Sequence, residues 1–498
     1  MGNKLNGILL ANGFPSSANE GSMYQNLAFS FKKAILNKQL RKDEKLPPTR
    51  LLASDLQISR STVLKAYEIL CIEKYVRAIH GSGYYVENIQ QKKIKISLPP
   101  ATKKNAKPDI SSRARSFRKN VQLMNRTDNK GIAFRPGLPP LDIFPVRKWQ
   151  QLTNNYWKQV TFSEMTYGAS LGLESLRRNI ADYLRIYRNI HCDYNQVVVV
   201  TGSLHSLSMV SDLLIDQNDQ VILENPTYAN ALAIFKSLKA KLIPTDIDDE
   251  GLNIKSVDLK KLKKPKLIYT TPSNQYPTGV QMSLKRRAEL LEWVSEQNCL
   301  IIEDDYDHEF SNWENPVASI FSLDKSDCVI YLGTFNKLLH PSIRLGYMII
   351  PPFLVDEMRA VYEQTLRFIS PVTQKVMSDF IEKNHLSNHL RKVVKVSNER
   401  RDFFVEQFQL CFGKEVKLLA LNSGLHLIAD ISQVNDVDLS KYLNDSGITV
   451  FPYSKYFLKG PKPNGLVMGF SSVDNSIIKE KVRKMYQLYR KFLSLNGG

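Results

Sequence analysis

A chain of 498 residues is too long for one ordinary hydrophobic core and predicts two or more domains. Its composition, 43% hydrophobic and 23% charged, is that of a soluble globular protein, and no apolar run approaches the roughly 18 residues of a membrane span. The N-terminus lacks the layout of a signal peptide, and the five scattered cysteines contain no CxxC pair, so we expect a cytoplasmic protein without a disulfide framework or a zinc site.

The net charge of +19 favours a polyanionic partner such as DNA, and much of it is concentrated in one segment. Residues 89–130 contain 12 Lys and Arg and 2 Asp, together with three prolines and few large apolar residues. Such a composition is typical of a flexible linker. Two interpretations stay open, a solvated tether or a tether that also contacts DNA phosphates.

The chain divides into four segments. Residues 1–20 show little periodicity and predict a loosely ordered lead-in, whereas residues 21–88 are helical and end in a β-like run. Residues 89–130 form the basic flexible linker. From 131 to 498 short apolar strands alternate with longer amphipathic helices, which predicts an α/β domain with a mostly parallel central sheet.

The second segment reads as a pair of short helices followed by a hairpin. A helix that Thr49 can cap is followed, after a short break, by a helix over residues 60–70 that Ser59 can cap. Two β-prone runs then flank a glycine turn at residues 81–83. A helix pair of this kind presents the first turn of its second helix to the major groove of DNA.

Three motifs make this assignment specific: Leu-Pro-Pro-Thr-Arg-Leu-Leu-Ala from residue 46, Ser-Arg-Ser-Thr-Val from residue 59, and Gly-Ser-Gly-Tyr-Tyr-Val from residue 81. They resemble the winged helix-turn-helix domain of the GntR family, which implies binding to double-stranded promoter or operator DNA. Lys45 and Lys74 depart from the family, which usually has glycine at both positions. The DNA contacts that the resemblance and the helix geometry imply are Arg50, Arg60, Ser61, Thr62, Lys65, His80 and Gly81.

In the fourth segment, five polar loops each follow directly on an apolar β-like run. In open α/β sheets ligands bind beyond the carboxyl ends of the strands, so this recurrence predicts a binding site. Any one of the loops alone could be a capped turn, core packing or a solvated turn. The loops cover residues 201–204, 224–228, 270–279, 303–307 and 333–337.

Together these loops resemble the fold-type-I aminotransferases, and specifically the MocR-type branch of GntR regulators, over residues 131–498. The strongest motifs are Thr-Pro-Ser-Asn-Gln-Tyr-Pro-Thr-Gly from residue 271 and Glu-Asp-Asp-Tyr-Asp from residue 303. A third is Gly-Thr-Phe-Asn-Lys from residue 333, with a proline and an arginine four and seven residues after its lysine. The resemblance implies that pyridoxal 5'-phosphate (PLP) is the cofactor and that no metal is required.

The resemblance also assigns roles to single residues. Lys337 would form the Schiff base, Asp304 would pair with the pyridine nitrogen, and Tyr306 would bond the ring oxygen. Tyr167 would reach into the site of a neighbouring subunit, which implies a homodimer. The remaining implied cofactor contacts are Tyr228, which would stack on the ring, Asn274 in the loop of potential ring contacts, and Gly202, Ser203, Leu204 and Arg344 at the phosphate.

Several positions depart from the catalytic relatives. Asn336 replaces a serine, and Leu204-His205 replaces a polar pair. Val467 stands where catalytic relatives carry the arginine that binds the substrate carboxylate, a charged hydrogen bond worth about 1.5–3 kcal/mol. We therefore hypothesise that the ligand is the cofactor itself or a compound that lacks an α-carboxylate.

These observations favour a DNA-binding transcription regulator that senses PLP, or an amine or amino-acid-related effector, through an aldimine at Lys337. The alternative is an active PLP-dependent aminotransferase with an appended regulatory DNA-binding module. The intact winged helix favours the first and the valine at 467 disfavours the second. A cofactor-free structural descendant is disfavoured because Lys337, Asp304 and Arg344 are all present.

Overall fold

The computed structural model describes residues 2–14, 22–87, 109–124, 131–257, 262–310, 317–421 and 424–496. The chain separates into an N-terminal unit, Met1–Pro108, and a C-terminal unit, Asp109–Gly498. Within the described residues, no helix is both long enough and apolar enough to cross a membrane.

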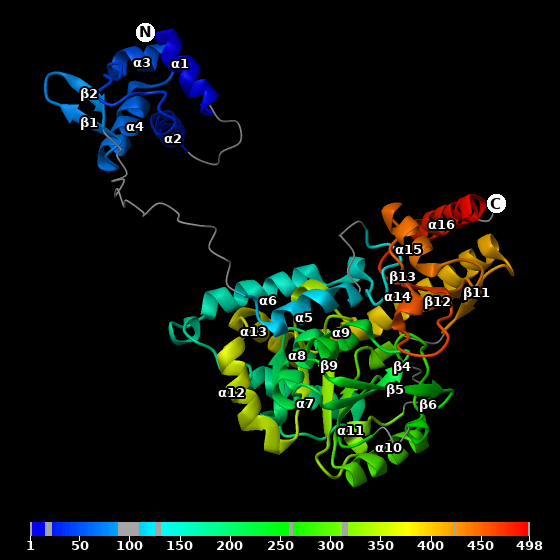
Figure 1. Cartoon of the computed structure of the whole chain (residues 1–498). Coiled ribbons are helices and arrows are strands. Elements are labelled where there is room, and N and C mark those ends of the chain that lie inside the picture. Colours follow the sequence, from blue (N-terminus) through cyan, green and yellow to red (C-terminus); the bar gives the residue numbers. More distant parts are fainter. Residues whose placement is uncertain are drawn as a thin grey trace. The chain divides into compact units, whose positions relative to one another are not determined.

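The N-terminal unit has the expected pair of helices and hairpin. The side chain of Ser59 accepts a hydrogen bond from the backbone N–H of Thr62 and so caps the second helix. Leu52, Val63 and Tyr67 are fully or almost fully buried in its core. Its elements are α1 (Gly2–Ala11), α2 (Met23–Leu36), α3 (Thr49–Asp55), α4 (Arg60–Ile72) and the antiparallel pair β1 (Val76–Ile79) and β2 (Gly83–Val86) (Figure 1).

The predicted lead-in differs from the structure. Residues 2–11 form α1, and Leu5, Leu9 and Phe14 are buried in the same core as α2 and α4. Leu5 and Leu9 are four residues apart and therefore share one face of a helix, a pattern too short to stand out among the polar residues around it. Residues 15–20 lie outside the described part of the chain.

The backbone conformation at position 74 accounts for one departure from the GntR pattern. Lys74 follows α4 and has a positive φ of 60°, in the left-handed region that favours glycine. The lysine thus adopts the backbone conformation of the glycine that it replaces. Lys45 instead forms a β-bridge with Tyr85.

The predicted linker also differs in part. Residues 88–108 and 125–130 lie outside the described residues, but residues 112–120 form helix α5 (Ser112–Asn120) of the C-terminal unit. Ser111 caps α5 by accepting the backbone N–H of Ala114, and Arg113 pairs with Asp212 on helix α8 (Ser203–Leu214). α5 packs along helix α9 (Ala229–Ser237). Part of a run that is basic in composition is therefore a helix docked on the C-terminal unit, with its basic side chains exposed.

The C-terminal unit is built on an eight-stranded, mostly parallel sheet with the strand order β3-β10-β9-β8-β7-β4-β5-β6. Strands β5, β4, β7, β8 and β9 run parallel, while β10 is antiparallel to both of its neighbours. The strands are β3 (Val197–Val200), β4 (Gln220–Asn225), β5 (Lys241–Asp248), β6 (Gly251–Leu252), β7 (Pro265–Thr270), β8 (Leu300–Asp304), β9 (Val329–Thr334) and β10 (Gly346–Ile349).

Helices bury both faces of this sheet. Ile302 packs in a core with residues of α7 (Glu174–Arg188) and α8, whereas its neighbour Ile301 packs in another with residues of α10 (Leu284–Gln297). Because both faces are covered, the inner strands β4, β7, β8 and β9 contain continuous apolar runs, as expected for parallel strands. The remaining helices of this part are α6 (Val146–Gln159), α7 (Glu174–Arg188), α10 (Leu284–Gln297), α11 (Ile320–Leu323), α12 (Val355–Thr365) and α13 (Pro371–Glu382).

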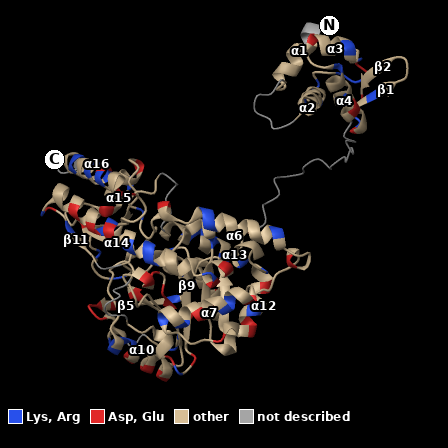
Figure 2. Cartoon of the chain, turned by 180° about the vertical axis from the view of Figure 1, so that it is seen from behind, with Lys and Arg blue, Asp and Glu red and all other residues tan. Residues whose placement is uncertain are grey.

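A smaller antiparallel sheet, with the order β11-β12-β14-β13, completes the unit. Its core includes Phe408, Leu427 and Met468. Figure 2 shows many Lys and Arg residues along its last helix, α16 (Asn475–Asn496). The elements are β11 (Lys417–Leu419), β12 (Leu427–Asp430), β13 (Phe451–Pro452), β14 (Gly465–Met468), α14 (His385–Phe412), α15 (Asp436–Asp445) and α16 (Asn475–Asn496).

Candidate functional site

A cavity of about 390 Å³ lies at the carboxyl ends of β4, β7, β8 and β9, where the sheet meets the smaller antiparallel sheet. Eight of the ten predicted cofactor residues line it: Gly202, Ser203, Leu204, Tyr228, Asp304, Tyr306, Lys337 and Arg344. The other residues of its wall include Arg135, Gly137, Tyr276, Asp307, His426 and Phe451.

Lys337 lies three residues beyond the end of β9, and its ammonium group faces the cavity. Its Nζ donates a hydrogen bond to the carbonyl oxygen of Gly137 at 2.8 Å. A β-carbon at Gly137 would displace this Nζ, and the φ of 72° at Gly137 lies in the left-handed region that favours glycine. Burial lowers the pKa of Lys337, against the opposing effect of the negative charges of Asp307 and Asp304. A lysine whose ammonium form is disfavoured is suited to covalent chemistry as a free amine.

Asp304, the last residue of β8, is 3% exposed and has one oxygen without a partner. Its Oδ2 accepts a hydrogen bond from the Tyr269 hydroxyl at 2.7 Å, while Oδ1 has no partner among the described residues. Burial raises the pKa of this carboxyl to about 7. An unpaired carboxylate oxygen in the wall of a cavity fits a protonated ring nitrogen, which would supply both a donor and a positive charge.

Another part of the cavity wall, formed by Gly202, Ser203 and Arg344, fits a phosphate. Gly202 precedes the first turn of α8, with a positive φ of 116°, and a β-carbon there would meet the amide of Asn336 at 2.8 Å. The backbone N–H groups at the start of a helix bind anions. Arg344 lies on the same wall, and no carboxylate of the described residues pairs with it.

The two departures at this end have structural roles. The ring of His205 accepts the backbone N–H of Thr201 through Nδ1 at 3.2 Å, and burial lowers the pKa of His205, which keeps the ring neutral. The Asn336 side chain accepts the backbone N–H of Leu345 at 3.4 Å and lies against Gly202. Neither substitution fills the cavity.

The two tyrosines predicted to contact the cofactor ring, Tyr228 and Tyr306, both line the cavity. Tyr228 directly precedes α9, and its hydroxyl accepts a hydrogen bond from Asn230 at 2.7 Å. The hydroxyl of Tyr306 donates to the backbone carbonyl of Asn274 at 3.0 Å. Both rings contact Tyr276 edge-on, so Tyr276 fixes their orientation.

Two predicted cofactor residues do not line the cavity. Asn274 is 3% exposed and lies behind the wall, where its amide donates to Oδ1 of Asp307 at 2.9 Å. Tyr276, two residues later in the same loop, lines the cavity in its place. Tyr167 is 71% exposed and stacks with the guanidinium of Arg367 instead.

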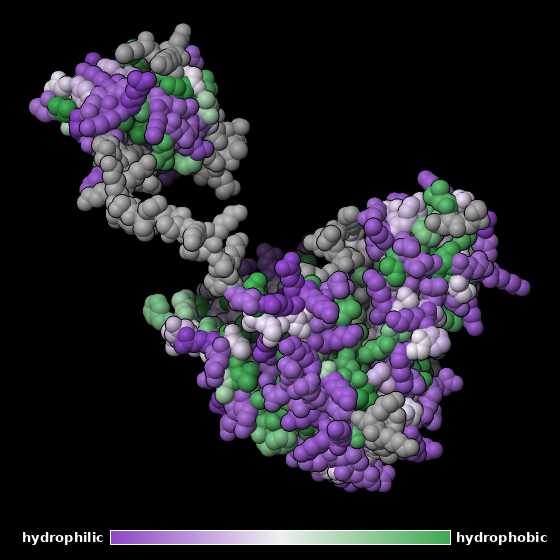
Figure 3. All heavy atoms as spheres, in the orientation of Figure 1, coloured by the Kyte–Doolittle hydropathy of each residue, from purple (hydrophilic) through white to green (hydrophobic). Residues whose placement is uncertain are grey.

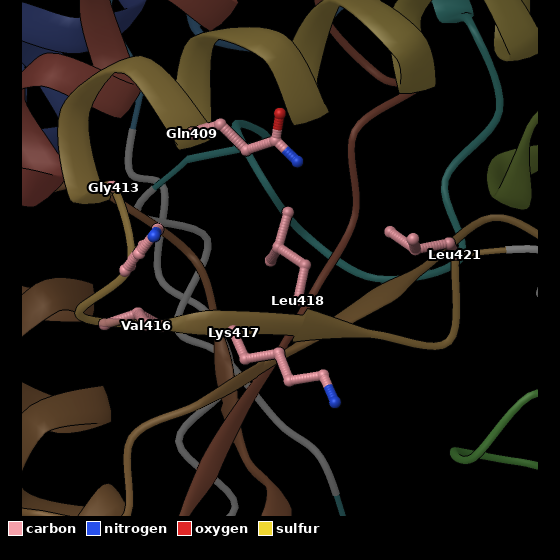
Figure 4. Close-up of a pocket in the computed structure, with 7 residues that line it drawn as sticks. Gln409, Gly413, Val416, Lys417, Leu418 and Leu421 are labelled. Carbon is pink, nitrogen blue, oxygen red and sulfur yellow. The ribbon is translucent and has the colours of Figure 1, made fainter.

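A second hollow, about 350 Å³ in volume, lies beside the end of α14 and β11 (Figure 4). Gln409, Lys417 and Leu418 are among its lining residues. None of the described residues that line it carries a carboxylate, and it lies on the smaller sheet rather than at the strand ends of the large one. The cavity at Lys337 is therefore the better candidate site.

The predicted DNA-contact residues are exposed or half-exposed on the N-terminal unit. Arg50 lies on α3, and Arg60 at the start of α4 donates to Thr49 at 3.4 Å, which brings the two helix starts together. Figure 2 shows basic residues on α3 and on the hairpin. The others lie on the first two turns of α4 (Ser61, Thr62 and Lys65) and in the turn between β1 and β2 (His80 and Gly81).

Comparison with known families decides the identity of both units. Residues 23–86 match the bacterial regulatory proteins of the gntR family, and residues 144–464 match aminotransferase class I and II. The chain is 31% identical over 471 residues to the probable rhizopine catabolism regulatory protein MocR of Rhizobium meliloti, with 93% of each chain covered. The chain belongs to the MocR-type subfamily of GntR transcription regulators.

Other relatives agree with this assignment. The HTH-type pyridoxine biosynthesis transcriptional regulator PdxR of Corynebacterium glutamicum is 26% identical over 87% of this chain and 88% of its own. Among solved structures, a kynurenine aminotransferase of Pyrococcus horikoshii superposes with a TM-score of 0.67 and 26% identity, covering 79% of this chain and 98% of its own. This MocR-type regulator thus carries an aminotransferase fold behind its GntR domain.

Sequence reasoning missed several cavity residues of this MocR-type regulator. Arg135 comes from an irregular segment before α6, and His426 and Phe451 come from the smaller sheet, so none follows a strand of the large sheet. The rule that ligands bind beyond the carboxyl ends of the strands therefore does not predict these residues. Asp307 did carry a signal, because it belongs to the acidic motif that begins at residue 303.

Proposed function

We propose that this regulator binds PLP at Lys337 and that occupancy of this site by PLP, or by an amine or amino-acid-related effector, controls DNA binding. One observation carries the proposal: a buried lysine, the unpaired Oδ1 of Asp304 and the glycine-led start of α8 line one cavity. PLP supplies an aldehyde carbon that bonds reversibly to primary amines. The partner is double-stranded operator DNA, and the compartment is the cytoplasm.

Different residues would bind the phosphate and the ring of the cofactor. Arg344 and the backbone of Gly202, Ser203 and Leu204 would hold the phosphate. Asp304 would hold the ring nitrogen in its protonated form, and Tyr228 and Tyr306 would contact the ring. Lys337 is the group that an incoming amine would have to displace. An effector then changes DNA binding only if it has different affinities for two conformations of the protein.

We further propose that the regulator is a homodimer in which Tyr167 contributes to the partner's site. Large apolar side chains are exposed next to Tyr167, in the turn between α6 and α7; Phe162 is 90% exposed and Met165 58%. Figure 3 shows hydrophobic residues gathered at the tip of this turn. Exposed apolar groups of this kind favour a protein interface. Sedimentation of the wild type and of a Phe162→Asp variant tests this, since the variant should shift towards the monomer.

The test of the cofactor site is an absorbance spectrum of the purified protein with PLP, beside a Lys337→Ala variant. We expect the band of lysine-bound PLP in the wild type and free PLP alone in the variant. Titration of operator DNA with both proteins, with and without PLP, then tests the link to DNA binding. Absence of the band from the wild type would remove the cofactor part of the proposal and leave the winged helix unaffected.

A working aminotransferase is the second candidate function, and Arg135 is the observation that favours it. Val467 is fully buried among aromatic residues and cannot bind a substrate carboxylate. Arg135, however, lines the cavity and its positive charge acts on Lys337. Release of a keto acid over many turnovers from an amino acid and an acceptor keto acid would support this alternative. Spectral change without turnover would support the regulator.

A further inference from the structure

Helix α5 places a group of positive charges on the surface of the C-terminal unit. Its four charged residues are all basic and all exposed, and none of its residues is buried. No described residue of α5 lines the cofactor cavity, so these charges are not part of the proposed PLP site. The four residues are Arg113, Arg115, Arg118 and Lys119.

The docking of α5 turns Arg118 away from the rest of the unit. The Ser116 hydroxyl donates to the carbonyl oxygen of Lys236 on α9 at 3.4 Å, and the Lys239 ammonium donates to the Ser112 hydroxyl at 3.5 Å. Ser112 and Ser116 are one turn apart and therefore share the face that contacts α9. Since each residue turns a helix by about 100°, Arg118 lies on the opposite face.

The carboxylates that border α5 lie towards its start. Asp109 pairs with Arg115 and Asp212 with Arg113, while Asp216 and Asp219 lie in the loop that contacts the backbone of Lys239 through Asn218. No carboxylate of the described residues pairs with the cations near the end of α5. We refer to these unpaired, exposed cations as the α5 surface: Arg118 and Lys119 on α5, and Lys236 on α9, which lies along α5 (Figure 1).

We propose that the α5 surface binds backbone phosphates of the DNA that flanks the site held by the winged helix. Double-stranded DNA is the polyanion that fits, because the same chain carries a GntR domain. DNA presents one negative charge for about every 1.7 Å of its axis, so a surface of three cations can meet several phosphates. This role goes beyond the proposed function and does not depend on PLP.

The order of the elements along the chain supports this partner. Among the described residues, α5 is the first element after the hairpin, and 25 residues separate Val86 from Ser112. Residues 88–108 contain six lysines and no Asp or Glu, so no acid in this connection repels DNA. A second contact on the same chain is held near the DNA by the first and adds to the affinity even if it is weak alone.

The experiment measures the affinity of the full chain for a random-sequence duplex by fluorescence anisotropy. Phosphate contacts do not depend on sequence, and each one lost lowers the slope of log affinity against log salt by about 0.9. In Arg118→Gln/Lys119→Gln the slope should therefore fall by about 1.8. Between about 200 and about 50 mM salt, the affinity advantage of the wild type should then grow about twelvefold.

Two further variants make the test specific. The matched control is Lys479→Gln/Lys491→Gln, which removes the same charge from exposed residues of α16 and should keep the wild-type slope. Lys236→Gln leaves α5 itself unaltered and should lower the slope by about 0.9, which keeps the proposal testable if the double variant fails to fold.

Unchanged slopes in both variants of the α5 surface would overturn the inference. An equal fall in the α16 control would also overturn it, because the effect would then be one of net charge. Basic residues in the last turn of a helix can stabilise that helix, so a lower melting temperature with an unaltered slope would mean a structural role only. Arg60→Ala is measured beside them: if only Arg60→Ala weakens binding, DNA binding by the winged helix stands and this inference alone has failed.

Discussion

Replacing Asp304 with asparagine is expected to stabilise the cofactor-free protein at neutral and alkaline pH. The carboxyl is buried, has one unpaired oxygen and has its pKa raised to about 7 by burial. Asparagine has nearly the same shape and can still accept the hydrogen bond from the Tyr269 hydroxyl through its amide oxygen. The variant therefore removes an ionisation without creating a cavity.

The size and sign of the effect follow from linkage between proton binding and folding. The folded protein holds the Asp304 proton up to a higher pH than the unfolded chain, for which the pKa is 3.8. Stability is therefore lost as the pH rises from about 4 to about 7. A difference of about three pH units corresponds to about 4 kcal/mol at full ionisation. Between pH 5 and pH 8 the variant should gain about 2.5 kcal/mol relative to the wild type.

Denaturant unfolding at pH 5 and pH 8 measures this difference. All four tryptophans lie beyond residue 130, so intrinsic fluorescence follows the unit that contains Asp304. Bound PLP should reverse the order of stability of the two proteins, because the protonated ring nitrogen supplies the missing partner of Asp304. The cofactor should therefore raise the melting temperature of the wild type more than that of Asp304→Asn. The reasoning is refuted if the stability difference between the two proteins does not change with pH.

Three further changes test other parts of the molecule. Leu9→Ala should destabilise the N-terminal unit by about 2–5 kcal/mol, whereas Leu10→Ala, at a side chain 60% exposed, should have little effect on its unfolding transition. Arg60→Ala should weaken operator binding about tenfold without changing the melting temperature, because the side chain is exposed; unchanged DNA affinity would exclude Arg60 from the interface. Arg135→Gln should weaken the binding of norleucine, which has an α-carboxylate, about tenfold relative to that of pentylamine, which has none. An unaltered ratio of the two affinities would mean that another group holds the carboxylate.

Much of the fold follows from the sequence because its strands and helices differ so clearly in pattern. Runs such as residues 221–223 and 329–332 are continuously apolar, as expected for parallel strands buried on both faces. The polar loops after them then meet at one edge of the sheet. Helices α1 and α5 were not predicted, because each is short and most of its evidence lies in distant partners such as Asp212.

The site was predicted only in part for a related reason. Residues at strand ends, such as Asp304 and Lys337, are placed by the sheet itself. Asn274 and Tyr276 lie in one loop, and which of them faces the cavity depends on the path of the loop rather than on the sequence pattern. Arg135 and His426 reach the cavity from segments that only tertiary packing brings there.

The docking of α5 on α8 and α9 shortens the connection between the two units. With residues 109–124 held by the C-terminal unit, 21 residues, 88–108, separate the last described residue of the winged helix from Asp109. A fully extended chain of this length spans at most about 70 Å, half of what residues 89–130 would allow. In the proposed homodimer this shorter length lowers the upper limit on the distance between the two winged helices, and therefore on the spacing of the operator half-sites that they can bind together.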